Sequence, residues 1–486
     1  MKQLLIMILL VGLIGSSSCK KEDLLSPLPP TSIIDSFAFE TPERIINQVR
    51  SLYANLKNGQ FYGGRYLIYN DIRSEEFLNQ LTNGVTGYGT WNFALTNTAQ
   101  EVQGLWSQAY YVINTANVFL DGMELKGKKV VSDSLATDYI AEARFIRALS
   151  YYSLLQLYAR PFWDGSGSKL GLPLRLTGNK KIQDYSLERS TVAQVYDQIL
   201  NDLNFAETNL PLKYSTDALN TSRAHRNTAI AIKTRVYLSM QRYDKVIEEA
   251  NKIVGTSAVS SAATGVNHKL EADVSLVFAA PYTLKESILS MPMTADETPG
   301  TQNQLGYYYS PTSGQGGVGN GEYALNPDGI ISNTGWTAAD KRRSSFVYTS
   351  ANGRVWLTKY KVRSPYTDWV PVIRYAEVLL NLSEALVRET HTVDTRALAL
   401  LNEVRKRSDP STTLAPADEN AMIDALLTER RIEFLGEGRR SPDLLRLGLT
   451  IPAKGAVVAV PSNDIKYIWP ISAAELLLNT KMIDNK

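Results

Sequence analysis

The chain is poor in the residues on which many enzymes and metal sites depend. Its 486 residues include one cysteine, Cys19, and three histidines, His225, His268 and His391. A lone cysteine can form no internal disulfide, and the histidines lack HExxH spacing or a cysteine partner. A GxSxG nucleophile elbow is also missing. The sequence therefore predicts no catalytic residue, no metal site and no cofactor.

One glycine motif could be mistaken for a nucleotide-binding loop. A literal GxGxxG runs from Gly314 to Gly319, but it follows Tyr-Ser-Pro-Thr instead of an apolar strand, and no helical pattern comes after it. Phosphate binding by such a loop needs both the strand and the helix. We therefore interpret it as an ordinary loop.

Charge is also nearly balanced. The 51 lysines and arginines exceed the 49 aspartates and glutamates by only two, which gives no electrostatic case for a nucleic-acid partner. The aromatic residues are unusual in kind, since 26 Tyr and 7 Trp stand against 12 Phe. Such side chains combine a flat apolar face with a polar edge, which suits a wet binding surface and equally suits tyrosine-rich helix packing.

The first residues have the pattern of a targeting signal. Lys2 precedes the apolar run Leu4 to Ile14, which is too short to span a bilayer as a mature helix, and small serines lead into Cys19. We expect residues 1–18 to be a lipoprotein signal peptide and Cys19 to be lipidated. Residues 19–40, which include three prolines, would form a short tether between the lipid and the fold.

Helical periodicity dominates the mature chain. Apolar residues recur at three- and four-residue steps in the segments 41–58, 102–123, 138–158, 192–208, 227–239, 243–254, 372–388 and 394–407. Tyr237, Tyr243, Val246 and Ala250 occupy the offsets of a tetratricopeptide helix pair. Because one such pair cannot bury its own apolar face, several must stack. The predicted fold class is mainly α, with four tetratricopeptide-like stacked helix pairs.

Two stretches break this rhythm. Residues 59–99 are expected to form a loop, and residues 255–370, rich in Gly, Ser, Thr, Tyr and Pro, to form an irregular lobe with short strands around Ile288 and Trp356. The predicted organisation is an N-terminal helical region (41–254), the irregular lobe (255–370) and a C-terminal helical region (371–486) that packs back on the helical lobe.

The segment ERRIEFLGEGRRSPDLLRLG, residues 429–448, alternates acidic and basic residues at helical spacing. We expect a helix that loosens at Gly436 and Gly438 and is ended by Pro442. The charges can form a structural ion-pair lattice or a ligand site, and the lattice is favoured.

Several motifs together resemble one family. The helix DYIAEARFIRALSYYSLLQLY from Asp138, the segment 429–448 and the terminal YIWPISAAELLLN from Tyr467 are similar, in this order along the chain, to the motifs of the SusD/RagB family of outer-membrane nutrient-binding lipoproteins. The resemblance implies a lipid-anchored protein on the outer membrane, facing the cell exterior, that captures a glycan or peptide and passes it to a SusC-like TonB-dependent transporter. It implies no enzymatic activity.

Sugar rings stack on Trp and Tyr, while their hydroxyls need polar neighbours. Two loop regions, residues 73–92 and 306–336, offer both kinds of side chain. The candidate ligand-binding residues are Arg73, Tyr88, Trp91, Asn92, Tyr307, Tyr308 and Trp336. The favoured function is glycan capture and transfer; a RagB-like peptide-binding role, a lipid-anchored glycan-cleaving enzyme and a purely structural scaffold remain as alternatives.

Overall fold

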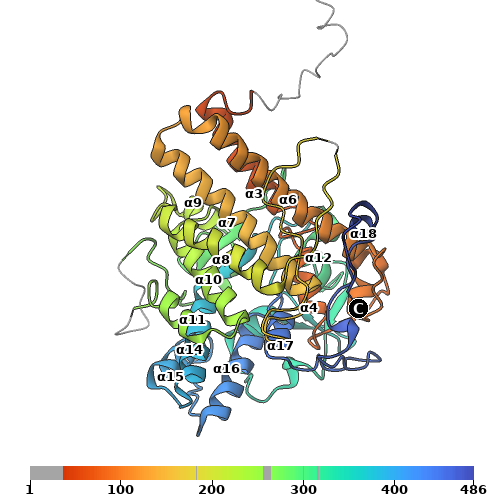
Figure 1. The fold of residues 1–486 in the computed structure, drawn as a ribbon. Helices are drawn as coiled ribbons and strands as arrows, with labels where there is room; N and C mark the ends of the chain where they lie inside the picture. The colour runs from red at the N-terminus through yellow and green to blue at the C-terminus, as the bar shows by residue number, and fades with distance from the viewer. Residues whose placement is uncertain (1–36, 182, 256–263, 299, 315–316, 486) are drawn as a thin grey trace, which may run out of the picture.

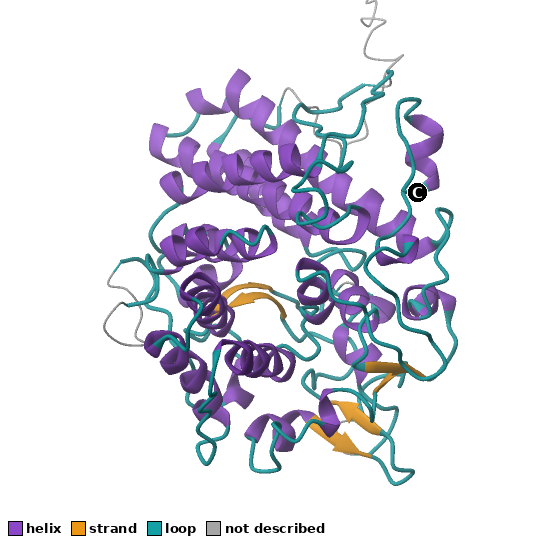
Figure 2. Cartoon of the chain, turned by 60° about the horizontal axis from the view of Figure 1, so that its bottom comes forward, coloured by secondary structure: helices purple, strands orange, loops and turns teal. Residues whose placement is uncertain are grey.

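The computed structural model describes residues 37–181, 183–255, 264–298, 300–314 and 317–485. The predicted signal peptide, Cys19 and nearly all of the tether lie outside these residues. The long helices form the larger part of the molecule, and loops with short strands cover one side (Figures 1 and 2). The main helices are α3 (Pro42–Leu56), α6 (Gln100–Leu125), α7 (Asp133–Tyr158), α8 (Val192–Asn209), α10 (Arg226–Ser239), α11 (Tyr243–Ala250), α14 (Tyr375–Thr390), α15 (Thr395–Ser408), α16 (Glu419–Glu433) and α17 (Arg440–Arg446).

These helices pack as the predicted pairs. Helix α3 lies on α6 and α7 on α8, while α10 pairs with α11 and α14 with α15; α6–α7, α8–α10 and α11–α14 contacts join one pair to the next. The expectation of a mainly α, tetratricopeptide-like stack is confirmed (Figure 1).

Local chemistry sets several helix ends. Thr41 caps α3 by accepting a hydrogen bond from the Arg44 N–H at 3.3 Å, with Pro42 as the first helical residue. Between α10 and α11 the chain turns at Gln241, whose φ of 56° is left-handed. Glycine usually occupies such a position because it has no Cβ.

Short antiparallel strand pairs join segments of the loop-rich side. Strand β1 (Phe77–Asn79) pairs with β3 (Tyr323–Leu325), β2 (Ser287–Met291) with β6 (Val370–Arg374), and β4 (Val347–Thr349) with β5 (Val355–Leu357), all antiparallel. The expected strands at Ile288 and Trp356 are thus present. The shorter helices are α4 (Arg65–Ile72), α5 (Tyr88–Trp91), α9 (Asp217–Ser222), α12 (Leu305–Tyr309), α13 (Lys341–Phe346) and α18 (Ala473–Leu478), with 3₁₀ turns η2 (Gly84–Thr86), η3 (Gly127–Lys129), η4 (Val274–Phe278), η5 (Thr301–Asn303), η6 (Ile330–Ser332) and η7 (Ile465–Tyr467).

The prediction of a loop over residues 59–99 was wrong in part, because α4 lies inside it. Every residue of α4 is buried, so the helix shows no apolar stripe against a polar face. Pattern reading detects a helix through that contrast and misses one that is enclosed on all sides.

The 429–448 segment forms an internal ion-pair lattice, as favoured from its sequence. The Glu433 carboxylate, buried at the end of α16, accepts hydrogen bonds from Arg342, Arg374 and Arg407 at 2.8, 3.0 and 2.5 Å. Lattice partners therefore come from the irregular segment as well as from the helices, and they bind the two together. The lattice cations are Arg342, Lys359, Arg374, Arg405 and Arg407, and its anions are Glu286, Asp340, Glu429, Glu433 and Glu437.

The role expected for Pro442 was wrong. Helix α16 ends at Glu433, and Gly436 and Gly438 turn the chain with φ of 81° and 69°. Pro442 lies in the first turn of α17, where a missing N–H costs no intrahelical hydrogen bond. Throughout the described residues, no helix combines the length and apolar character needed to cross a bilayer.

Candidate functional site

The two loop regions predicted to hold binding residues lie side by side. Strand pairing joins Phe77 to Leu325 and Asn79 to Tyr323. Two hydrogen bonds continue this contact, from the Tyr323 hydroxyl to the Thr86 carbonyl at 3.0 Å and from the Thr86 hydroxyl to Glu322 at 2.7 Å. Two segments that lie more than 200 residues apart in the sequence are thus held against each other.

Three of the candidate residues are internal. Arg73 is fully buried, donates to the Tyr467 carbonyl at 2.7 Å, and has its pKa lowered to about 10 by burial. Tyr308 is also fully buried and donates to the Gln302 carbonyl, while Trp336 is 3% exposed with the Arg343 guanidinium 4.6 Å above its ring. In these positions the three side chains pack the interior and offer no face to a ligand.

Of the other four candidates, one is buried and three are partly exposed. Trp91 is buried, donates from Nε1 to the Phe77 carbonyl at 2.8 Å, and stacks on Tyr88 with ring centroids 5.8 Å apart. Tyr88, Asn92 and Tyr307 are partly exposed. Trp91 therefore supports the loop, and the partly exposed side chains are the ones able to meet a ligand.

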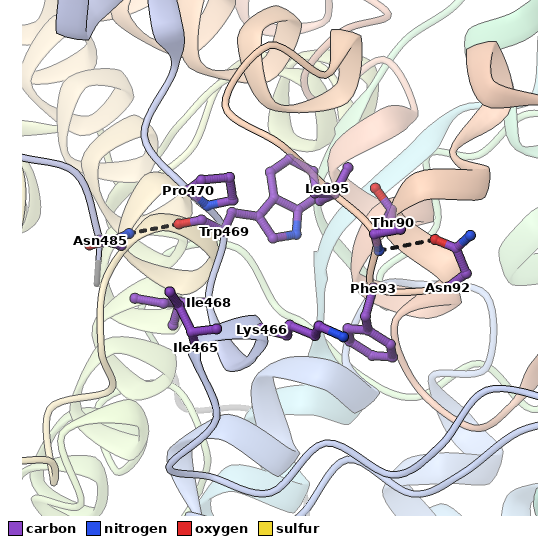
Figure 3. A pocket seen from close by; sticks show the side chains of 11 residues that line it. Thr90, Asn92, Phe93, Leu95, Ile465, Lys466, Ile468, Trp469, Pro470 and Asn485 are labelled. Atoms are coloured by element: carbon purple, nitrogen blue, oxygen red, sulfur yellow. Dashed lines mark hydrogen bonds between the residues drawn. The ribbon is translucent and has the colours of Figure 1, made fainter.

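A hollow of about 390 Å³ opens next to this loop (Figure 3). The loop after α5 forms one wall, and the C-terminal segment around Trp469 forms the other. Of the seven candidates only Asn92 lines it, and its Oδ1 accepts a hydrogen bond from the Ala94 N–H at 3.0 Å. The hollow is lined by Thr90, Asn92, Phe93, Ala94, Leu95, Ile465, Lys466, Ile468, Trp469, Pro470 and Asn485.

Trp469 is the main aromatic side chain of this hollow. It is 2% exposed, and its ring packs against Tyr69 and Tyr158 at centroid distances of 5.3 and 5.5 Å. Its carbonyl accepts a hydrogen bond from Asn485 at 2.6 Å. These contacts fix the indole at the edge of the hollow (Figure 3).

Two polar groups at the hollow have no hydrogen-bond partner among the described residues, namely the Trp469 Nε1–H and the Thr90 hydroxyl. A buried donor without a partner costs about 1–3 kcal/mol. Both atoms are buried beneath the wall and have almost no exposed surface of their own. Asn92 and Lys466 put polar groups beside Leu95 and Ile468 in the lining, which suits a molecule that carries both hydroxyls and apolar faces.

A buried lysine supports the loop from within. The Lys454 ammonium donates to the carbonyls of Ile72 and Ser74, and lies 4.9 Å from the Phe93 ring and 5.7 Å from the Trp91 ring. Burial lowers the pKa of Lys454 well below its usual value. These contacts tie the aromatic loop to the end of α4.

A more polar hollow of about 480 Å³ adjoins the first and shares Ile465 and Ile468 with it. Its walls carry Trp163, Lys169 and Asn463, and Arg160, which forms an ion pair with Asp164 at 2.6 Å. Together the two hollows make a groove along residues 462–470. The sequence reading missed this segment as a binding wall, although it alternates polar residues with Ile and Trp.

The fold and this groove define a class: a mainly helical, tetratricopeptide-like protein with a ligand-sized groove in its loop layer. Residues 30–238 match the family described as "Starch-binding associating with outer membrane", and residues 302–486 match the SusD family. The chain belongs to the SusD/RagB family, whose members are associated with the outer membrane.

Individual relatives agree with this assignment. A SusD superfamily protein from Bacteroides fragilis is 33% identical, with a TM-score of 0.81 over 91% of this chain and 99% of that one. SusD-like protein P2 of Formosa agariphila is 24% identical over 98% of this chain and 97% of its own. Surface glycan-binding protein A from Bacteroides thetaiotaomicron, solved in complex with laminarihexaose, has the same fold at 18% identity, with a TM-score of 0.73 over 92% of this chain and 99% of that one.

Proposed function

We propose that this protein is a cell-surface lipoprotein that captures a glycan in the groove along residues 462–470 and passes it to a SusC-like TonB-dependent transporter. The observation that carries the proposal is the first hollow, where the polar groups of the partly exposed Asn92 and the exposed Lys466 lie beside apolar side chains. Sugars present hydroxyls and C–H faces together, and such a wall matches both.

The proposed mechanism is binding and release, with no bond made or broken. Ile468 and Leu95 offer apolar contact, and the free amide edge of Asn92 and the Lys466 ammonium can contact hydroxyls. Capture by SusD-like relatives, one of them named a starch-binding protein and another solved with laminarihexaose, supports a carbohydrate as the ligand class. The signal-like residues 1–18 and Cys19 support the lipid anchor.

The rival glycan-cleaving enzyme would need a pair of carboxyl groups facing the groove. The sequence-adjacent pair Glu75 and Glu76 does not meet this need, because Arg431 and Arg440 hold both carboxylates in ion pairs at 2.5 to 4.0 Å. Neither residue lines either hollow of the groove.

A glycan and peptide array followed by titration calorimetry tests the proposal. Asn92→Ala and Lys466→Ala should each weaken binding of the best array glycan about tenfold, the effect of losing a hydrogen bond worth roughly 1.4 kcal/mol. Tyr111→Ala, which removes an exposed aromatic of α6, is the matched control and should bind as the parent does.

Three outcomes would overturn the proposal. Unchanged affinity in both groove variants would place the ligand elsewhere. Binding of peptides alone would favour the RagB-like role. Release of shorter sugars from a polysaccharide by the purified protein would favour the enzyme.

A further inference from the structure

A separate apolar hollow lies where the described chain begins. It has a volume of about 400 Å³, and its walls include Phe39, Val118, Gly122 and Leu125. Figure 1 shows the described chain starting at the top of the molecule, where the helix ends of this part of the stack lie. Leu125, the last residue of α6, lies in the wall of this hollow and is 74% exposed.

Phe39 fixes the start of the chain against α6. Its ring lies 5.8 Å from that of Phe119, and it comes so close to Gly122 that a Cβ there would meet the ring at 2.1 Å. Glu40 adds an ion pair with Lys126 at 3.0 Å. The described chain therefore begins beside this hollow, with Ala38 and Phe39 in its wall.

Basic side chains gather around the hollow. Five exposed lysines belong to it or follow it closely, namely Lys126, Lys128, Lys129, Lys180 and Lys181. Three of them are in ion pairs with Glu40, Glu124 and Asp121, and the exposed Asp133 begins α7 nearby. Within the described part of the chain, no acidic group pairs with Lys129 or Lys181. Apolar residues ringed by lysines are typical of surfaces that lie on anionic lipid.

The length of the preceding chain limits how far this end can lie from a membrane. Eighteen residues lead from Cys19 to Phe37. A chain of that length spans about 23 Å when flexible and roughly 60 Å when fully extended. If Cys19 carries lipid, as the proposed function states, the end of α6 is held near the bilayer.

We propose that the end of α6 docks on an anionic lipid bilayer, with Leu125 in the headgroup region, the hollow against the apolar part of a lipid, and Lys129 and Lys181 against phosphates. This inference rests on the lipid anchor of the proposed function but not on glycan capture. It gives the protein a defined orientation on the membrane, set by the docked helix end.

Lipid quenching of a fluorophore tests this orientation. Leu125→Cys in the full chain is labelled with bimane, and the acylated protein is placed in vesicles of phosphatidylcholine and phosphatidylglycerol that contain doxyl lipid. Leu477→Cys is the matched control because Leu477, on α18, is an equally exposed leucine at 81%. The parent chain, treated with the same dye, gives the background from Cys19.

The label at position 125 should lose at least about half of its fluorescence to doxyl lipid, since this residue is expected in the headgroup region, and the label at 477 should lose none. Vesicles of phosphatidylcholine alone, or the double variant Lys129→Glu/Lys181→Glu, should reduce the quenching at 125. Equal quenching at both positions, or none at 125, would overturn the proposal. An apolar emission shift at 125 without lipid would also overturn it, because the chain's own N-terminal residues would then fill the hollow.

Vesicle flotation distinguishes the absence of a lipid anchor from the absence of docking through α6. A protein that does not float with the vesicles has no lipid anchor, whereas one that floats without quenching at 125 is anchored but does not dock through α6.

Discussion

Replacing Glu433 with glutamine tests whether the buried lattice holds the helical and irregular parts together. Burial by itself would raise the pKa of Glu433, but the guanidiniums of Arg407, Arg374 and Arg342 lower it well below the usual value. The carboxylate is thus charged and satisfied by three cations. Glutamine keeps the shape of the side chain, but the negative charge of the carboxylate is lost and an amide N–H₂ group must face a guanidinium.

The size of the loss in free energy of unfolding depends on the acidic partners that the three arginines keep. Arg342 and Arg374 each keep two acidic partners, but Arg407 keeps only Glu286, at 2.8 Å. Removing one partner of a buried ion pair costs about 3–5 kcal/mol. Here the loss leaves one cation of the lattice in excess of the anions, and this positive charge stays buried. We expect Glu433→Gln to lower the free energy of unfolding by that amount at pH 7.

Urea unfolding followed by circular dichroism measures the change. Glu403→Gln is the matched control, since Glu403 is an exposed glutamate of α15, and it should shift the free energy by less than about 0.5 kcal/mol. The lowered pKa of Glu433 gives stability that is present above the unfolded-state pKa and lost as the pH falls through the folded-state value. The stability of Glu433→Gln should therefore fall less than that of the parent on acidification. A loss below about 1 kcal/mol at pH 7 would refute the reasoning, because it would mean that the lattice gains nothing over a neutral amide.

Two further predictions concern stability. The stacked pair His225 and His268 is buried, and burial lowers their pKa values to about 3 and about 4. Below about pH 6.5 the unfolded chain takes up protons at these residues while the folded chain does not, so folding stability should fall between pH 6.5 and 4. In a series of thermal melts, His268→Asn should show a shallower fall of stability with pH than the parent. Equal slopes for both proteins would contradict this. Gly438 has a φ of 69°, and a Cβ there would come within 2.8 Å of the α4 backbone. Gly438→Ala should therefore lower the free energy of unfolding by more than about 2 kcal/mol in urea. Gly84→Ala is the control and should lower it by less than about 1 kcal/mol, because nothing lies within 4 Å of a Cβ at that position. Similar costs for the two glycines would show that the close approach at Gly438 relaxes freely.

The sequence revealed the helices that have two unlike faces. In α3 and α8 apolar residues alternate with polar ones at helical spacing, and both helices lie where that spacing predicts. Helix α4 could not be found in this way because it is buried on every side. The ion-pair lattice was anticipated at Glu433, but its partners Arg342 and Arg374 lie in other parts of the chain and no local pattern connects them.

The binding residues were harder to predict. Composition identifies Trp and Tyr in loops but does not tell whether a ring faces outward, and Trp336 proved to be enclosed while Asn92 lines a hollow. The other wall of that hollow comes from residues 465–470, about 370 residues further along the chain. Only the fold brings these segments together, so the groove could not be read from either segment alone.

The most direct test of glycan capture is a crystal structure of the protein with the best oligosaccharide from the array. We expect a sugar hydroxyl within hydrogen-bond distance of the Lys466 ammonium, and a sugar ring beside Asn92 in the hollow (Figure 3). A ligand bound at another surface, with the hollow holding only water, would contradict it.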